Sequence, residues 1–350
     1  MRAFGERLVR WQKAHGRHDL PWQRSRDPYR IWLSEIMLQQ TQVATVIPYY
    51  ERFLARFPDV VGLAQAGLDD VLKLWSGLGY YSRGRNLHKA ARTIVSGALG
   101  PGSFPRDIAS LQSLPGIGRS TAAAIAVFAF GAREAILDGN VRRVLSRHFA
   151  VPGSPGDKQV EKGLWMLAES LLPARDLEQY TQALMDLGAT LCTRTRPRCE
   201  LCPVNATCMA LQQGRVAAFP EARARKPLPQ RAATMLVLLH QGRILLEKRP
   251  ASGIWGGLWC LPELPGGAVA QSWSKARYGC VIGMPEAMPE LAHGFTHFRL
   301  SITPLVCRVK RVESRTAEPG PAWFDREYAG EEAIPVPVRK ILAQIARSKA

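Results

Sequence analysis

The sequence predicts a multidomain protein, with an all-α N-terminal region followed by an α+β C-terminal region. The chain has 350 residues, enough for about two or three domains that each bury a core of their own. From Arg7 to about Leu211, apolar residues recur at three- and four-residue spacing, which is the helical period. Strand-like runs follow only after the proline-rich, basic segment Gly214–Arg231, whose composition is typical of an extended linker.

Individual elements follow from local patterns. Asp27 and Pro28 supply an N-cap and a first-turn proline, which predicts a largely buried helix through the apolar run Ile31–Leu38. After the linker, two apolar runs flank His240-Gln-Gly242 and predict a β-hairpin. Further along the chain we expect a strand within Arg299–Val312 and an amphipathic closing helix near Val338–Ala346.

Composition narrows the class of protein. Lys and Arg number 47 against 29 Asp and Glu, which gives a formal charge of +18 and favours polyanions as partners. An apolar fraction of 46% argues against disorder, and we find no run of about eighteen uncharged apolar residues that would span a membrane. Seven cysteines without an export signal predict a reducing, cytoplasmic location and no disulfide framework.

Four of the cysteines form a cluster. Cys192, Cys199, Cys202 and Cys208 are separated by six, two and five residues. Four free buried thiols and a zinc site are the alternatives, but zinc usually takes two paired Cys-x-x-Cys arms and only one such pair is present. The spacing favours a [4Fe–4S] cluster. Arginines at 194, 196 and 198 would then make the ordered loop a basic surface suited to phosphates.

The segment Leu114-Pro-Gly-Ile-Gly118 interrupts two helical stretches. Glycines at Gly116 and Gly118 let backbone N–H groups approach a phosphate at the start of the next helix. Such a hairpin would hold a DNA backbone without reading its sequence, although an ordinary turn between helices explains the segment equally well on its own.

Together, these features resemble the endonuclease III superfamily of helix-hairpin-helix DNA glycosylases, and within it the adenine DNA glycosylases, the MutY family. The resemblance covers nearly the whole chain and is carried by the cysteine cluster and by four motifs: Trp32-Leu-Ser-Glu-Ile-Met-Leu-Gln-Gln-Thr-Gln42, Gly77-Leu-Gly-Tyr-Tyr81, Leu114-Pro-Gly-Ile-Gly-Arg-Ser-Thr121 and Ile136-Leu-Asp-Gly-Asn-Val-Arg-Arg143. It implies two helical lobes, one of them holding the cluster, with DNA and a flipped adenine between them.

Two carboxylates are the candidate catalytic groups. Glu35 stands among large apolar residues, so burial should raise its pKa until it can donate a proton. The resemblance assigns it protonation of adenine at N7. Asp138 would cap the next helix, and the resemblance gives it stabilisation of the oxocarbenium-like sugar, supported by Asn140. A solvated surface Glu and a simple N-cap are the plainer alternatives.

Ser120 separates subfamilies within the resemblance. Bifunctional relatives carry a lysine there, whose amine attacks C1′ and leads to strand cleavage. A hydroxyl forms no imine, so base removal by water is expected, although Ser120 could also be only a small residue in a first helical turn.

Other roles come from the resemblance alone. Gln40 and Tyr80 match positions that fill the gap left by the flipped base. The further matches are the base pocket, Leu20, Trp22, Val43 and Gln182, and the DNA-binding positions Gly116, Gly118 and Arg142.

The C-terminal region resembles the Nudix fold. Gly257 and Glu263 keep the first half of a Nudix box, but Gln271-Ser272 replaces its Arg-Glu pair and Lys275-Ala276 replaces its paired glutamates, so magnesium-dependent hydrolysis is not expected. In the family this domain recognises 8-oxoguanine through a loop that aligns with Phe295-Thr296-His297.

We therefore expect a monomeric, monofunctional glycosylase that removes adenine opposite 8-oxoguanine or guanine in duplex DNA, without membrane association and close to the bacterial nucleoid. The alternatives are a bifunctional glycosylase/lyase of the same superfamily, a non-catalytic lesion sensor and, least favoured, a nucleotide pyrophosphatase. The expected domains are a glycosylase region at 1–213, a linker at 214–231 and a Nudix-like domain at 232–346. Within the first, a six-helix lobe would span about 24–132 and an iron–sulfur lobe 1–23 with 133–213.

Overall fold

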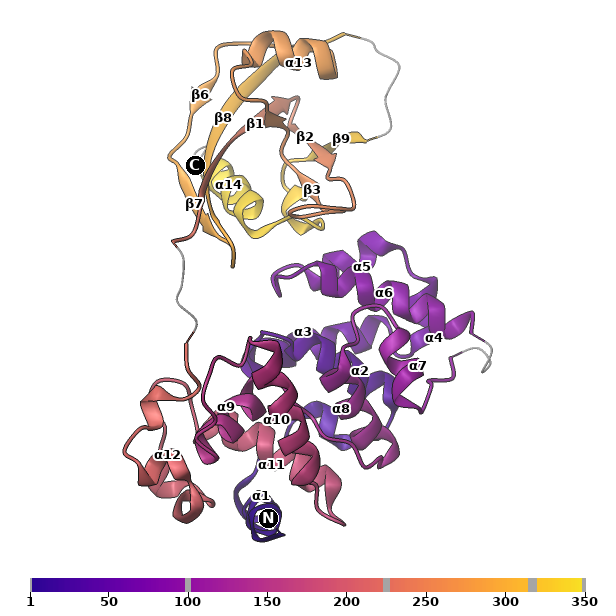
Figure 1. Cartoon of the computed structure of the whole chain (residues 1–350). Coiled ribbons are helices and arrows are strands. Elements are labelled where there is room, and N and C mark those ends of the chain that lie inside the picture. Colours follow the sequence, from indigo (N-terminus) through magenta and orange to yellow (C-terminus); the bar gives the residue numbers. More distant parts are fainter. Residues whose placement is uncertain (1, 98–101, 223–226, 314–319, 348–350) are drawn as a thin grey trace. The chain divides into compact units, whose positions relative to one another are not determined.

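The computed structural model describes residues 2–97, 102–222, 227–313 and 320–347 (Figure 1). Contacts divide the chain into two units. One comprises residues 1–65 and 86–225, and the other comprises residues 66–85 together with 226–350. The predicted glycosylase region includes residues 66–85, which the contacts place with the C-terminal residues instead. The predicted domain boundaries stay a prediction.

The first unit is built from helices, as the apolar spacing predicts. Its helices are α1 (Arg2–His15), η1 (Pro21–Arg24), α2 (Pro28–Leu38), α3 (Val43–Arg56), α4 (Val60–Gln65), most of α6 (Ser82–Val95), α7 (Ile108–Ser113), α8 (Arg119–Phe130), α9 (Gly139–His148), α10 (Lys158–Ser170), α11 (Leu177–Thr190), η2 (Cys199–Leu201), η3 (Asn205–Thr207), α12 (Met209–Gln212) and η4 (Val216–Ala218).

Helix α2 begins and ends where its sequence predicts. The Asp27 carboxylate accepts a hydrogen bond from the Tyr29 backbone N–H at 2.9 Å, and Pro28 occupies the first turn. Helix α2 packs against α8, whose stretch Ala122–Val127 is fully buried. Small alanine side chains let the two helix backbones approach closely, and this contact holds the middle of α2 inside the unit.

A second set of helices surrounds the start of α9. A buried cluster joins side chains of α1, α8, α9, α10 and α11, with Leu8, Val141, Leu145 and Leu187 among its fully buried members. Burial of each such side chain contributes about 1.5–3 kcal/mol. The cluster therefore fixes the N-terminus of α9, where Asp138 lies.

The second unit contains α5 (Leu68–Trp75) and a mixed sheet of order β3-β2-β1-β8-β5. Its centre is the parallel pair β1 (Gln230–His240) and β8 (Arg299–Val312), in register from Gln230 opposite Arg299 to Leu239 opposite Arg308. The remaining elements are β2 (Arg243–Lys248), β3 (Trp259–Cys260), β4 (Glu263–Leu264), α13 (Ala270–Tyr278), β5 (Cys280–Ile282), β6 (Glu286–Ala287), β7 (Leu291–Gly294), β9 (Pro321–Asp325), η5 (Ala329–Glu331) and α14 (Val336–Arg347).

Three predictions for this region are confirmed. Strands β1 and β2 form the antiparallel hairpin around Gln241-Gly242, β8 covers Arg299–Val312, and α14 is the closing amphipathic helix, with buried Val338, Ile341 and Ile345.

The predicted linker is partly structured. The short helix η4 lies within it, the Phe219 side chain is buried, and the Arg147 guanidinium donates to the Phe219 carbonyl at 2.9 Å. Residues 223–226 of the predicted linker lie outside the described part. Among the helices that the structure describes, none has the length and apolar character needed to cross a membrane.

Candidate active site

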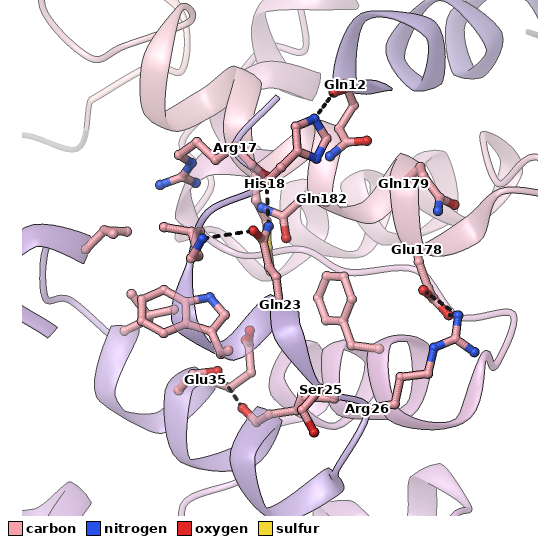
Figure 2. Close-up of a pocket in the computed structure, with 18 of the residues that line it drawn as sticks. Gln12, Arg17, His18, Gln23, Ser25, Arg26, Glu35, Glu178, Gln179 and Gln182 are labelled. Carbon is pink, nitrogen blue, oxygen red and sulfur yellow. Dashed lines mark hydrogen bonds and ion pairs between the residues drawn. The ribbon is translucent and has the colours of Figure 1, made fainter. Parts of the chain in front are cut away.

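A cavity of about 410 Å³ opens beside the middle of α2, within the first unit. Glu35 lies on its wall, and Figure 2 shows Glu35 on α2 and Gln182 on α11 at two sides of the same space. The four predicted base-pocket residues all line this cavity: Leu20, Trp22, Val43 and Gln182. Residues from η1, α2, α3 and α11, distant in sequence, are thus brought around one carboxyl group.

The carboxyl group of Glu35 has an unusual pKa. Burial, and to a smaller degree the negative charge of Asp138, raises the pKa of Glu35 to about 8. Its side chain keeps an intermediate accessibility, because the exposed part faces the cavity. Glu35 is therefore protonated at neutral pH and can donate a proton to a group placed in the cavity.

Gln182 is held in place by residues that the sequence did not indicate. Its side-chain amide donates to the Asp186 carboxylate at 2.8 Å, and Asp186 is fully buried. The Arg17 backbone N–H and guanidinium donate to the same carboxylate at 2.9 and 2.7 Å. The i, i+4 spacing of Gln182 and Asp186 on the buried face of α11 is the pattern that could have revealed this support.

Asp138 lies at the N-terminus of α9, as predicted. Its carboxylate accepts from the Val141 backbone N–H at 2.8 Å, and burial raises the pKa of Asp138, opposed by hydrogen bonds from Val141 and Asn140 and by the Arg143 charge. Asp138 is not among the residues that line the cavity, yet its charge reaches Glu35. The two carboxyl groups are therefore electrostatically coupled, although only Glu35 lines the cavity.

Asn140 lies in the first turn of α9 and packs against Gly188 of α11. A Cβ atom on Gly188 would lie 2.5 Å from the Asn140 Cβ, so only glycine allows this approach. The Asn140 carbonyl oxygen accepts from Arg143 at 2.8 Å, while its N–H groups face Asp138. Asn140 thus orients the carboxylate that precedes it.

Ser120 lies in the first turn of α8. Its hydroxyl oxygen accepts a hydrogen bond from the Leu137 backbone N–H at 3.0 Å. The contact ties α8 to the segment that ends at Asp138, so this serine has a positioning role that a small residue alone would not have.

The two predicted gap-filling residues share a backbone feature. Gln40 and Tyr80 both have left-handed conformations, with φ of 58° and 47°, and both side chains are exposed. Such conformations are uncommon outside glycine and cluster at functional loops. Each residue lies in its own unit.

The predicted DNA-binding hairpin joins α7 to α8. Gly116 has φ of 83°, and Gly118 is the N-cap of α8 with no neighbouring atom near its missing side chain. Arg142, by contrast, is engaged within the protein: its guanidinium donates to the carbonyls of Leu137 and Pro155 and pairs with Glu161.

The second unit holds a different cavity, of about 650 Å³. The predicted recognition residues Phe295, Thr296 and His297 line it together with Tyr80 and the neighbouring Arg85. Thr296 and His297 are exposed loop residues, and the Phe295 N–H closes the turn on the Phe298 carbonyl at 2.9 Å. One predicted gap-filling residue and the predicted recognition loop thus share a cavity.

Comparison with known proteins now identifies the family. Residues 33–170 match the family model of the HhH-GPD superfamily base excision DNA repair protein, and residues 233–344 match the NUDIX domain. The adenine DNA glycosylase of Buchnera aphidicola subsp. Acyrthosiphon pisum is 37% identical over 340 residues, 97% of this chain and 96% of that protein. The chain belongs to the adenine DNA glycosylase family. It is an enzyme of base excision repair that hydrolyses N-glycosyl bonds.

Further matches agree with this family. The human adenine DNA glycosylase is 35% identical over 402 aligned positions, which cover 97% of this chain and 73% of the human protein. Among solved structures, a thermostable thymine-DNA glycosylase superposes with a TM-score of 0.55 at 30% identity, covering 60% of this chain and 95% of that one. The predicted fold class, a helix-hairpin-helix glycosylase region with a Nudix-like domain, is confirmed.

The cysteine cluster of this family member lies against the helical core. Cys192 and Cys202 pack on the hydrophobic cluster around α9 and α11, and Arg147 donates to the Cys192 sulfur at 3.4 Å. Burial and the neighbouring thiols raise the pKa of Cys199, Cys202 and Cys208, so the four sulfurs lie within electrostatic range of one another.

The four thiols can be compared with the donor sets of two kinds of metal group. Over the ranges that the structure describes, no group of three or more His, Cys, Asp or Glu side chains could hold one metal ion. Zinc would require four sulfurs about 2.3 Å from one centre, whereas an iron–sulfur cluster takes each thiolate on a different iron. Four neighbouring thiols with one guanidinium beside them match the donor set of an iron–sulfur cluster and also that of a four-sulfur zinc site.

Proposed function

We propose that this adenine DNA glycosylase is monofunctional and removes adenine opposite 8-oxoguanine or guanine in duplex DNA, acting as a monomer close to the nucleoid. The observation that carries the chemistry is Glu35, a carboxyl group with a pKa of about 8 on the wall of a cavity of about 410 Å³. Pockets of about 300–1,000 Å³ accept small ligands, so one flipped purine is a suitable occupant.

The reaction uses Glu35 as a general acid. Its proton moves to N7 of the flipped adenine, which withdraws electrons from the C1′–N9 bond and lets the base leave as a neutral purine. Trp22 and Leu20 offer apolar surface to the base, and the Gln182 amide, fixed by Asp186, supplies directional hydrogen bonding.

Asp138 acts on the sugar. Cleavage of the C1′–N9 bond leaves a positive, oxocarbenium-like deoxyribose that a nearby carboxylate stabilises. Asn140 and the α9 backbone hold that carboxylate. Water then adds to C1′ and yields an abasic site, and its released proton restores the carboxyl pair to its starting state.

Monofunctional action rests on Ser120. Its oxygen accepts a hydrogen bond from the Leu137 N–H, and a hydroxyl cannot form a Schiff base with C1′. One lysine, Lys13, does lie on the cavity wall, but its ammonium group is paired with Asp176 at 2.9 Å. An amine held in an ion pair with a carboxylate is a poor nucleophile.

The test combines excision with trapping. Single-turnover reactions on a duplex with adenine opposite 8-oxoguanine should release adenine and leave an intact abasic strand, without a borohydride-trapped complex. Efficient strand cleavage with trapping would favour the bifunctional alternative. A Lys13→Met variant then identifies the amine, because loss of trapping in that variant would assign the lyase activity to Lys13.

The choice of mispair rests on the second cavity. Its exposed Thr296 and His297 carry a hydroxyl and an imidazole that can hydrogen-bond to the added oxygen and N7-H of 8-oxoguanine. Single-turnover rates on duplexes that differ only in 8-oxoguanine, guanine or thymine opposite adenine test this, and we expect excision in that order. Equal rates on all three duplexes would contradict the proposal.

The four clustered cysteines would hold a [4Fe–4S] cluster, which supplies structural order to the loop between them. Arg194, Arg196 and Arg198 are exposed on that loop and face solvent as a phosphate-binding surface. Iron and acid-labile sulfide should each approach about four atoms per chain. A stoichiometry of one zinc per chain, without sulfide, would contradict the cluster.

Phosphate contacts should dominate the affinity for DNA. Each neutralised phosphate contributes about 0.9 to the slope of log affinity against log salt. Binding to DNA should therefore weaken steeply as salt rises for a chain of charge +18. An affinity that does not change with salt would argue against phosphate contacts by the arginines of the cysteine loop and by the hairpin at 114–118.

A further inference from the structure

A tryptophan in the second unit has an unusual backbone conformation. Trp255 has φ of 55°, a left-handed value that is strained for a bulky residue and persists only where the surroundings require it. Its side chain is only 7% exposed. The conformation thus places a large ring inside the protein at an energetic cost.

The loop around Trp255 is tightly held. A Cβ atom on Gly256 would lie 2.4 Å from the Ala251 carbonyl, so only glycine fits there. The Arg85 guanidinium donates to the Gly256 carbonyl at 2.6 Å, and the Leu258 N–H donates to the Trp255 carbonyl at 3.0 Å. These contacts hold the backbone at and after Trp255, and with it the direction in which the side chain leaves the chain.

That ring packs behind the proposed recognition loop. The Trp255 ring centroid lies 5.6 Å from that of Phe295 and 5.9 Å from that of His293. Phe295 stacks on Phe298 at 4.4 Å with an angle of 20°, and the Arg231 guanidinium lies over the Phe298 ring at 4.5 Å. Aromatic pairs at these separations are stabilising, so Trp255, Phe295, Phe298 and Arg231 form one stacked series.

His293 packs against Trp255 and Phe295, beside this series. Burial, and to a smaller degree Lys340, lowers the pKa of His293, which keeps this imidazole neutral near pH 7. Trp255 and Phe295 also line the cavity of about 650 Å³ with Thr296 and His297. A shift of the Trp255 ring would thus move the loop side chains that reach solvent.

We propose that Trp255 is a positioning residue for discrimination between 8-oxoguanine and guanine: its ring sets the pose of the Phe295–His297 loop. The proposal rests on the proposed function of that loop and adds a residue that no motif indicated. Trp255 acts through Phe295 and does not itself contact the reacting adenine, so it should affect the choice of substrate more than the chemistry.

The test compares Trp255→Ala and Trp255→Phe with the wild type. Single-turnover excision of adenine is measured opposite 8-oxoguanine and opposite guanine, together with the melting temperature. Trp255→Ala should lower the ratio of the two rates about tenfold, mainly through the 8-oxoguanine substrate, while Trp255→Phe should restore most of the ratio because it keeps an aromatic contact.

Trp259→Ala is the matched control. Trp259 packs on Phe324 at 4.9 Å in the same unit but does not line the cavity, so its loss should lower stability without changing the ratio. Equal losses on both substrates in Trp255→Ala, or an unchanged ratio, would overturn the inference. A wild-type chain that fails to discriminate would overturn the proposed function itself, and the inference with it.

Discussion

The cavity beside Glu35 and the cavity beside Trp255 are lined by different kinds of side chain. The first is lined by the Glu35 carboxyl group, which Asp138 influences from outside the lining, together with apolar, amide and ion-paired side chains. The second is lined by aromatic rings, the His293 imidazole, exposed loop residues and two arginines, Arg85 and Arg231. A charge that is costly to bury suits proton transfer, whereas stacked rings suit the recognition of shape. Substitutions in the first cavity should therefore alter the rate of adenine excision. Substitutions in the second should alter the preference for the base opposite adenine.

The largest effect is expected for Glu35→Gln. It keeps the shape of the side chain but removes the transferable proton, so single-turnover excision should fall by about 10²–10⁴-fold, while DNA affinity stays within a few-fold. Glu178→Gln is the matched control, since Glu178 lines the same cavity but is paired with Arg26. Similar losses in both variants would mean that the cavity tolerates no substitution and that Glu35 has no special role.

Asp138→Asn should have the next largest effect. Asparagine is as good an N-cap as aspartate, so the melting temperature should change little while excision falls by about 100-fold through loss of the negative charge at the sugar. Asp138→Ala separates the two roles, because it should lose about 1 kcal/mol of stability as well. An active Asp138→Asn enzyme would leave Asp138 with a capping role only.

The excision rate and the preference for 8-oxoguanine should depend differently on pH, because only the first relies on the Glu35 proton. Because the pKa of Glu35 is about 8, its proton is present at neutral pH and is lost above pH 8. Single-turnover excision should then fall about tenfold per pH unit above that value, whereas the preference for 8-oxoguanine should stay constant over the same range. A rate that stays flat up to pH 10 would contradict proton donation by Glu35.

The raised pKa of Glu35 also predicts that the free energy of unfolding depends on pH in the wild type but not, through this residue, in Glu35→Gln. The folded state keeps the Glu35 proton up to about pH 8, while the unfolded chain releases it near pH 4.5, so wild-type stability falls across that window. Glu35→Gln should match the wild type near pH 4 and exceed it by up to about 3 kcal/mol at pH 7. Denaturant unfolding at the two pH values measures the difference, and a constant difference would contradict the raised pKa.

The smallest effect is expected for Thr296→Ala in the recognition loop. Loss of one exposed hydroxyl that approaches His297 at 3.4 Å should lower the 8-oxoguanine preference by about three- to tenfold and leave the rate opposite guanine unchanged. Excision kinetics on the two duplexes measure this. A rate loss opposite guanine as well would place Thr296 in the chemistry and remove the contrast between the cavities.

Elements with local determinants could be predicted from the sequence. Asp27 and Pro28 mark the start of α2, and Asp138 caps α9, because a cap depends on the next three residues alone. Strand β8 also follows its own apolar pattern. The raised pKa of Glu35 was predictable from its apolar neighbours on the helix, whereas Leu20, Trp22, Val43 and Gln182 lie outside the quoted motifs and came from the family resemblance alone.

Features that depend on distant partners could not be predicted. Asp186 is a buried carboxylate whose role is clear only from Arg17, 169 residues away. Trp255 is conspicuous only through its backbone angle and the rings packed against it. The grouping of residues 66–85 with the C-terminal residues likewise has no pattern in the sequence, since contact between segments leaves no local periodicity.

The central claim is that Glu35 carries a proton at neutral pH because the protein buries it. The most direct measurement is the carboxyl pKa itself, from carbon NMR of protein labelled at the glutamate side-chain carboxyl, with Glu35→Gln to assign the resonance. We predict that the resonance missing in the variant titrates near pH 8. Titration near pH 4.5 would show a carboxylate that is already ionised under working conditions, and proton donation to adenine by Glu35 would then have to be abandoned.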